Sequence, residues 1–188
     1  MFTKISTILF IFLTLLSCQK ENKKDPFKIS YNKIGDLTNT TRVNQLDSIY
    51  KNDSIVKPSK NTQFLGIANT IEIYEKGGAK LLALEPREPN NPESSIESIQ
   101  IIDPRYKTSS GLSIDGVFID IKNNYTVTKI SNTLSAAVIF IDSIQASIAI
   151  DKKGLSNELK SNTDIKIRAS QIPDSAKIKH FLINWDEN

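Results

Sequence analysis

The sequence contains only one cysteine and one histidine among its 188 residues. A single cysteine cannot form an intrachain disulfide, and together with one histidine it cannot supply the ligands of a Cys/His zinc site. The phosphate-binding patterns G-x-x-x-x-G-K-[ST] and G-x-G-x-x-G are absent, as is the nucleophile pattern G-x-S-x-G. The motifs therefore assign no catalytic, cofactor-binding or metal-ligating residue.

A large excess of charge is lacking as well. The net charge is +3, and loss of Lys4 with a cleaved leader would lower it to +2, because no acidic residue precedes Cys18. An excess this small does not favour a nucleic-acid partner. The length and the 39% share of hydrophobic residues predict one globular domain with an N-terminal appendage.

The most apolar run lies at the N-terminus. Residues 5–16 follow the positive Lys4, and a helix of this length would extend about 18 Å, short of the roughly 30 Å hydrocarbon core of a bilayer. A positive residue, a short apolar run and a small residue, here Ser17, are typical of a secretory signal peptide. The sequence therefore predicts a cleaved leader over residues 1–17.

Residues 15–18, Leu-Leu-Ser-Cys, resemble the lipobox of bacterial lipoproteins. The resemblance implies that signal peptidase II cleaves before Cys18, whose thiol carries S-diacylglycerol and whose new amino group is N-acylated. Several acyl chains, at about 0.8 kcal/mol per buried methylene, make attachment to the lipid bilayer effectively permanent. Residues 18–26 then form the lipidated cysteine and a flexible polar tether, and residues 27–188 form the domain.

The residues after Cys18 bear on the destination of such a lipoprotein. Gln19 stands where an aspartate would resemble an inner-membrane retention signal, so we expect the outer membrane. Residues 19–21, Gln-Lys-Glu, also resemble the lysine-plus-acid export tag of surface lipoproteins from Bacteroidota-type bacteria. Asn22 interrupts the run of acids that such a tag carries, so the periplasmic side and the cell surface both stay open.

Alternating or continuous apolar runs predict strands along most of the domain. These runs cover residues 27–31, 71–74, 81–84, 96–102, 127–130, 136–141, 145–150, 165–167 and 177–185. Gly77 and Gly78 predict a tight hairpin between two of them. The last run has apolar residues on both faces, with Ile178, His180 and Leu182 expected on one of them, and therefore belongs inside a sheet.

Two segments show the apolar spacing of short helices, residues 43–50 and residues 114–121. Their expected N-caps are Thr40 or Thr41 and Ser113 or Asp115. Residues 85–93 contain three prolines and are expected to form an exposed loop. Together these elements predict an α+β fold, with a mainly antiparallel sheet of about eight strands and two short helices packed on it.

Acid–base chemistry would require two carboxyl groups within several ångströms of each other in one cleft. The candidate acids are Glu72, Glu85, Asp115, Asp120 and Asp151. Each is more simply explained as a turn, cap or solvated residue. The one histidine, His180, is expected to be a packed or surface residue of a strand, since no second histidine or free cysteine accompanies it.

Four Asp-Ser-aliphatic triplets resemble the O-glycosylation site of envelope proteins from Bacteroidota-type bacteria. They begin at Asp47, Asp53, Asp142 and Asp174. Of the four serines, Ser54 is the predicted site of modification, because it is expected in the loop after the first helix.

Two longer segments resemble the RpoE-regulated lipoproteins of proteobacteria, an envelope family without an assigned function. They are ISYNKIGDLTNTTRVNQLDSIYKN, residues 29–52, and QIPDSAKIKHFLINW, residues 171–185. Residues 71–86 and 108–116 lie between them in the family's order of elements. The family has no catalytic residues to transfer, and the resemblance implies an outer-membrane lipoprotein.

These observations predict a non-enzymatic outer-membrane lipoprotein whose domain binds an unknown protein or glycan in the envelope or outside the cell. One alternative is an envelope hydrolase that acts on glycan or peptide through paired carboxylates. Another is an inhibitor of a cell-wall hydrolase. Two acids with raised pKa values in one cleft would favour the enzyme, whereas a convex or flat apolar patch would favour binding.

Overall fold

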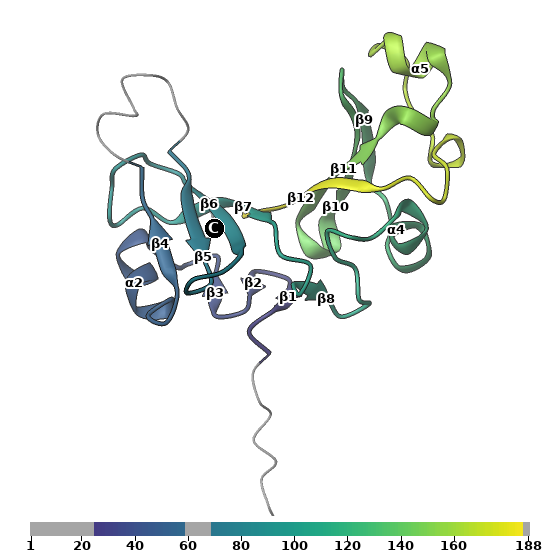
Figure 1. Cartoon of the computed structure of the whole chain (residues 1–188). Helices are drawn as coiled ribbons and strands as arrows, with labels where there is room; N and C mark the ends of the chain where they lie inside the picture. The colour runs from purple at the N-terminus through teal and green to yellow at the C-terminus, as the bar shows by residue number, and fades with distance from the viewer. Residues whose placement is uncertain (1–24, 59–68, 186–188) are drawn as a thin grey trace, which may run out of the picture.

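The computed structural model describes residues 25–58 and 69–185. Within this part of the chain, twelve strands form two sheets, and short helices pack against them in an α+β fold (Figure 1). The expected fold class is confirmed, while the number of strands exceeds eight because a second, small sheet is present. The predicted leader, Cys18 and most of the tether lie outside the described residues.

The larger sheet contains eight strands, and every neighbouring pair in it is antiparallel. Across the sheet the strands are β4 (Ser54–Val56), β5 (Ile71–Tyr74), β6 (Lys80–Pro86), β7 (Ile96–Ile101), β12 (Ile178–Asn184), β11 (Ala146–Asp151), β10 (Ala136–Ile141) and β9 (Lys129–Asn132). The last strand of the chain therefore lies inside the sheet, between β7 and β11, as its two apolar faces predicted.

The smaller sheet lies beneath the middle of the larger one (Figure 1). Its strand order is β3 (Leu37–Thr38), β2 (Lys33–Ile34), β1 (Lys28–Ser30) and β8 (Lys107–Thr108), and only the β1–β8 pair in it is parallel. Gly35 follows β2 with a φ of +56°, and a Cβ at this position would lie 2.2 Å from the carbonyl oxygen of Pro26. Glycine is thus required where the chain enters the domain.

One row of buried side chains runs across six strands of the larger sheet. In register, the row consists of Ile73, Leu82, Ile101, Phe181, Ile148 and Ile139. All of these side chains are at most 1% exposed. They belong to one hydrophobic core with residues of the small sheet and of the helices, such as Ile29, Leu46 and Phe118.

The two predicted helices are each one residue shorter than expected, and their N-caps differ from the prediction. The first comprises 3-10 helix η2 (Val43–Gln45) and α2 (Leu46–Ile49), and the N–H of Arg42 donates to Oε1 of Gln45. Neither Thr40 nor Thr41 is therefore the N-cap. A third helix, α5 (Asn157–Ser161), was not predicted from the sequence and is capped by Ser156.

The second predicted helix is α4 (Phe118–Asn124), which begins after Ser113 and Asp115 instead of at them. The N-cap is Val117, whose N–H donates to Oδ2 of Asp120 at 2.9 Å. The N–H groups of the first helical residues donate to the carbonyl oxygens of Ala176 and Asp174. Hydrogen bonds to a distant segment of the chain thus satisfy the N–H groups at the start of this helix. The local sequence around a helix start cannot predict such bonds.

Three strand-level expectations are wrong. Residues 165–167 form no strand, because the Nδ2 group of Asn132 donates to the carbonyl oxygen of Ile165 and holds the segment as a loop. In β12 a bulge at Lys179 turns Ile178 toward the core, since Ile150 pairs with Ile178 while Ala149 pairs with His180. The expected loop over residues 85–93 begins later, because β6 extends to Pro86.

Candidate binding surface

The face of the larger sheet that points away from the core is accessible to solvent, and we call it the open face. Its side chains alternate along β5–β7 and β9–β12 with those of the buried rows. In order across the sheet they include Glu72, Tyr74, Ala83, Glu85, Ser98, Gln100, His180, Leu182, Asn184, Ser147, Ala149, Asp151, Val138, Phe140, Ser131 and Lys129. Most of these side chains are half-buried or exposed, and several are polar.

Cross-strand hydrogen bonds order the centre of the open face. The side-chain amide of Gln100 lies 3.2 Å from Nδ1 of His180. In register, Gln100 lies opposite Ala83, and His180 lies opposite Ala149. Because the two alanines are small, the amide and the imidazole are accessible from above the sheet. His180 is therefore an exposed residue of a strand, one of the two placements expected for it.

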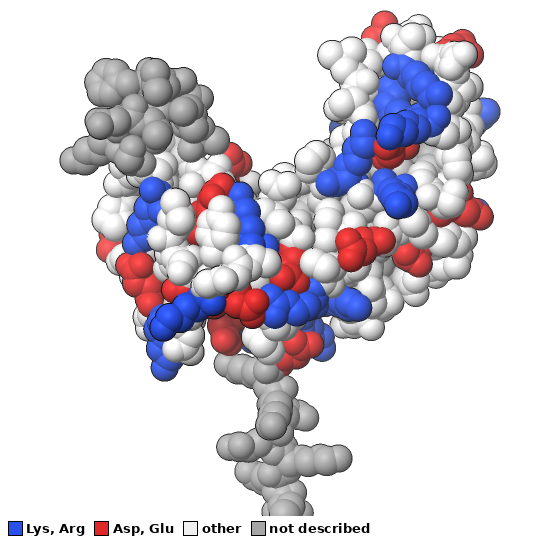
Figure 2. Space-filling view, in the orientation of Figure 1, with Lys and Arg blue, Asp and Glu red and all other residues white. Residues whose placement is uncertain are grey.

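The two ends of the open face differ in their charged groups. At the β5–β6 end, the ammonium of Lys80 and the hydroxyl of Tyr74 both donate to Glu72, and these hydrogen bonds lower the pKa of Glu72. At the other end, the ammonium of Lys129 lies 5.3 Å from the ring centre of Phe140. Figure 2 shows that Lys and Arg side chains gather on the arm of the molecule that carries β9 and α5.

Asp151 lies among the lysines at this end of the sheet. Its carboxylate is 3.5 Å from the ammonium of Lys179 and 3.9 Å from that of Lys153. The hydrogen bond from the main-chain N–H of Lys153 is the largest cause of the lowered pKa of Asp151, and the two ammonium groups contribute to it. Asp151 thus serves as a capping and ion-pairing residue.

A hollow of about 380 Å³ lies at the edge of the open face, where the β10–β11 hairpin meets the β1–β2 turn. Its lining residues are Tyr31, Phe140, Ile141, Asp142, Gln145, Ala146 and Asn184. Tyr31 is 60% exposed, although large hydrophobic side chains are mostly buried in this domain. A volume of this size falls in the range of small-ligand sites.

Two residues with positive φ hold the hollow in shape. Asn32 follows Tyr31 with a φ of +56°, and Gln145 follows the 3-10 turn η3 (Asp142–Ile144) with a φ of +53°. The N–H of Asn32 donates to Oε1 of Gln145 at 3.0 Å. The carbonyl oxygen of Gln145 in turn accepts the N–H of Asn184 at 2.8 Å. Segments from both ends of the domain and from the hairpin are therefore fixed around one cavity.

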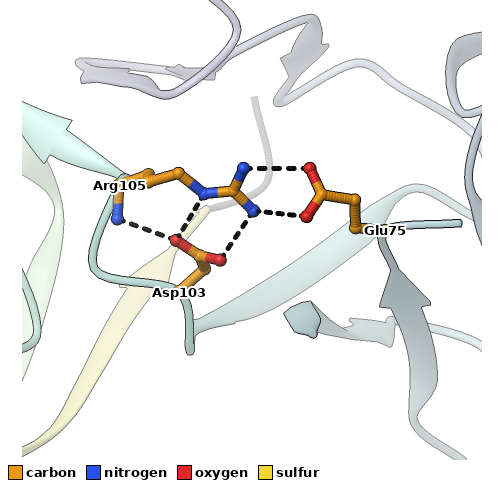
Figure 3. Close-up of polar contacts among 3 residues, drawn as sticks. All are labelled: Glu75, Asp103 and Arg105. Atoms are coloured by element: carbon orange, nitrogen blue, oxygen red, sulfur yellow. Dashed lines mark hydrogen bonds and ion pairs between the residues drawn. The ribbon is translucent and has the colours of Figure 1, made fainter. Parts of the chain in front are cut away.

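A separate cluster of carboxylates surrounds Arg105 (Figure 3). The guanidinium donates to Glu75 at 2.9 and 3.1 Å and to Asp103 at 2.8 and 3.0 Å. These hydrogen bonds hold the pKa values of both carboxyl groups below their ordinary range. The guanidinium carbon also lies 4.5 Å from the ring centre of Phe27, so the cluster fastens the first residues of the domain.

A small cavity of about 210 Å³ adjoins this cluster. Burial raises the pKa values of Tyr50 and Tyr106, which line it. Burial, followed by the nearby charge of Glu75, also raises the pKa of Asp53. Asp36, Asp53 and Glu75 line this cavity, and Arg105 donates to the carboxylate of Glu75.

The acids singled out in the sequence lie in three regions of the structure. Glu72 and Glu85 lie toward one end of the open face and Asp151 toward the other, while Asp115 and Asp120 lie at the start of α4. Ser54 is exposed, as a modified serine must be, but it is the first residue of β4 and does not lie in a loop. Its O-glycosylation stays a prediction.

Within residues 25–58 and 69–185, three or more His, Cys, Asp or Glu side chains do not come together as a metal site. None of the helices in the described ranges has the length and apolar character needed to span a bilayer.

Sequence reasoning did not find the residues that line the hollow. Tyr31 was assigned to a strand, and Phe140 and Asn184 were counted only as parts of apolar runs. One signal was present, because in a sheet with a buried face the residues that alternate with the core positions must lie on the other face. Applied to β10 and β12, this rule identifies Phe140 and Asn184 as open-face residues.

No family model matches the chain, and no curated protein matches it. Among solved structures, the chain is similar to the uncharacterized protein YfeY from Escherichia coli, with 16% sequence identity and a TM-score of 0.49. The similarity covers 84% of this chain and 99% of that one. A likeness at this level carries no argument about function, and the family expected from the sequence stays a prediction.

Proposed function

We propose that the chain is a non-enzymatic outer-membrane lipoprotein that is anchored through acylated Cys18 and binds a partner with its open face. The observation that carries the binding role is the hollow of about 380 Å³ at the edge of that face, with the exposed Tyr31 in its wall. An exposed aromatic residue beside a preformed cavity is typical of a binding site.

The hydrogen bonds that fix the side chains of the open face support this binding role. Hydrogen bonds join Gln100 to His180, Asn184 to Ser147 and Ser98 to Glu85, each across neighbouring strands or along a diagonal of the sheet. Groups fixed in this way lose little conformational entropy when a ligand binds, which favours affinity. A ligand in the hollow would also be able to extend over these strands.

In this proposal only a short segment of chain separates the lipid anchor from the first residues of the domain. If Cys18 carries the lipid, residues 19–25 can span at most about 25 Å between the bilayer and the domain. Contacts hold the chain to the domain from Pro26 onward, because Gly35 packs against Pro26 and the guanidinium of Arg105 lies over the ring of Phe27. The binding surface would therefore work close to the membrane.

The hydrolase alternative has one observation in its favour, the raised pKa of Asp53 beside Glu75. An acid with a raised pKa suits a proton donor. Its neighbour, however, is held as an ion pair by Arg105, as Figure 3 shows, and this pairing opposes a role as nucleophile or base. The inhibitor alternative differs from our proposal only in the partner, which would then be a cell-wall hydrolase.

The binding role can be tested by sedimentation with isolated cell envelopes. A secreted, lipid-free form that begins at Gln19 should sediment with envelopes in a saturable manner. Ser147 is half-buried on the open face next to Phe140 in register, so Ser147→Trp should block the surface and reduce sedimentation. Asn123→Trp on the exposed side of α4 is the matched control. Equal sedimentation of both variants would contradict the proposal.

A further inference from the structure

We propose that the ligand of the hollow is a polysaccharide and that one sugar ring lies in the hollow between Tyr31 and Phe140. This inference rests on the proposed function, because it names the chemical class that the same surface binds. It is carried by the side chains that line the hollow, by their unused hydrogen-bonding atoms and by the shape of the adjoining sheet.

The two aromatic side chains supply flat apolar contact. Tyr31 is 60% exposed and Phe140 is half-buried, and both line the hollow. The C–H groups on one face of a pyranose ring pack well against such rings, whose surface is apolar and polarizable. Lys129 lies 5.3 Å from the centre of the Phe140 ring and would limit its movement.

The polar residues of the hollow retain free hydrogen-bonding atoms. The Nδ2 group of Asn184 donates to Ser147, which leaves Oδ1 of Asn184 to accept. Gln145 uses Oε1 to accept from Asn32, which leaves its amide nitrogen to donate, and Asp142 uses one carboxylate oxygen to accept from Thr128. Neighbouring hydroxyl groups of a sugar both donate and accept hydrogen bonds. The two amides and the carboxylate can therefore bond to adjacent hydroxyl groups.

The chemistry of the open face favours a glycan over a protein ligand. Protein interfaces depend on anchors such as tryptophan, tyrosine and arginine. None of these occurs among the open-face side chains of β9–β12, and Tyr31 is the one such residue that lines the hollow. Among the described residues, the exposed large hydrophobic side chains are Tyr31, Val56 and Leu134, and the last two do not line the hollow. The surface beyond the hollow includes small and polar side chains such as Ser147, Ala149 and His180, beside the aliphatic Val138 and Leu182.

The same strands give the ligand room to continue. From β10 across β11 and β12 to β7, three strand spacings correspond to about 14 Å. The side chains along this path include Ser147, His180 and Gln100, which are half-buried or exposed. The site therefore suits a chain of several sugars more than a single one.

The class of ligand is tested with envelopes treated in two ways before sedimentation with the lipid-free form. Digestion with a protease should leave binding unchanged, because it removes protein and spares glycan. Mild periodate oxidation, which cleaves vicinal diols of sugars, should abolish binding. The opposite pattern, with binding lost after protease and kept after periodate, would overturn the polysaccharide proposal while the binding role stood.

The residues are tested with polysaccharide purified from the protease-treated envelopes. Tyr31→Ala and Asn184→Ala should each weaken binding about tenfold, since each removes one ring contact or one hydrogen-bonding side chain. Leu134→Ala removes an exposed hydrophobic side chain that lies neither in the hollow nor among the open-face strand residues, and it should bind like the natural protein. Because Tyr31 is exposed, its loss should not unfold the domain, and a circular dichroism spectrum checks this.

If Tyr31→Ala and Leu134→Ala bound the polysaccharide equally well, the hollow would not be the site. If the natural protein bound untreated envelopes but not the purified polysaccharide, the proposed ligand class would be contradicted, while the proposed binding role would stand. Failure to bind untreated envelopes at all would instead contradict the proposed function. The three results are therefore distinguishable.

Discussion

The N–H of Asn32 donates to Oε1 of Gln145 at 3.0 Å, although the two residues are 113 positions apart. Both residues have a positive φ, +56° and +53°, a conformation that non-glycine residues rarely adopt. The small sheet is joined here to the β10–β11 hairpin, and the hollow lies at the junction. Two uncommon backbone conformations at one cavity fit a site whose shape matters for function.

The lipid anchor gives the first prediction. Replacing Cys18 with alanine removes the thiol that would carry diacylglycerol and should abolish labelling by radioactive palmitate. The leader should then remain attached, so the protein should migrate as a heavier precursor in gel electrophoresis. Continued palmitate labelling of the Cys18→Ala protein would contradict the lipobox interpretation.

The entry of the chain into the domain gives the second prediction. Gly35→Ala should destabilise the fold by about 1–2 kcal/mol for the positive φ alone, with a further cost because the new Cβ would lie 2.2 Å from the carbonyl oxygen of Pro26. Gly78→Ala is the control, since its nearest contact would be an ordinary 3.5 Å. Urea unfolding of the two variants measures the difference, and equal stabilities would refute the packing described for Gly35.

The Arg105 cluster predicts a dependence of stability on pH. Hydrogen bonds from Arg105 lower the pKa values of Asp103 and Glu75 from their ordinary 3.8 and 4.5. The stabilisation is therefore fully present above these ordinary values and is lost as the pH falls through the lowered ones. Arg105→Met should destabilise the domain at neutral pH, and the difference from the natural protein should shrink in acid.

Denaturant unfolding at neutral pH and at about pH 2.5 measures this effect. Arg42→Met is the matched control, because Arg42 pairs with Glu93 at 2.7 Å while both side chains are 57% exposed. Exposed pairs of this kind contribute about 0–1 kcal/mol. A difference between Arg105→Met and the natural protein that stayed constant over this pH range would argue against the assigned role of the two carboxylates.

The buried Lys152 gives the fourth prediction. Its ammonium donates to Oδ1 of Asn132 at 2.7 Å and to the carbonyl oxygens of Thr133 and Lys160 at 2.8 and 3.3 Å. Lys152→Met would leave these buried acceptors without a donor and should cost about 1–3 kcal/mol. Lys153→Met should change stability by less than about 0.5 kcal/mol, because the Lys153 side chain is 90% exposed. Thermal unfolding of both variants provides the comparison.

The elements predicted correctly from the sequence are those set by local chemistry. The hairpin at Gly77 and Gly78 follows from two residues that accept unusual backbone angles, and β12 follows from apolar residues on both of its faces. The small sheet was missed because β1 pairs with β8, with Lys28 opposite Lys107. No local pattern reveals a parallel pair of two or three residues at that separation.

The candidate site was less predictable for the same reason. Tyr31, Asp142 and Asn184 come from three distant segments, and only the register of the strands and the bond between Asn32 and Gln145 bring them together. The sequence did show that the phosphate-binding and nucleophile motifs are absent and that a Cys/His zinc site cannot form. It could not show that the acids it offered fall into three regions of the domain.

Photocrosslinking in intact cells tests the central claim most directly. Benzoylphenylalanine in place of Tyr31 would put a reactive ring into the hollow, and in place of Asn123 it would put the same ring on the exposed side of α4. Our account predicts a discrete crosslinked product from position 31 and none from position 123. Products from position 123 alone, or equal products from both positions, would contradict a binding site at the hollow.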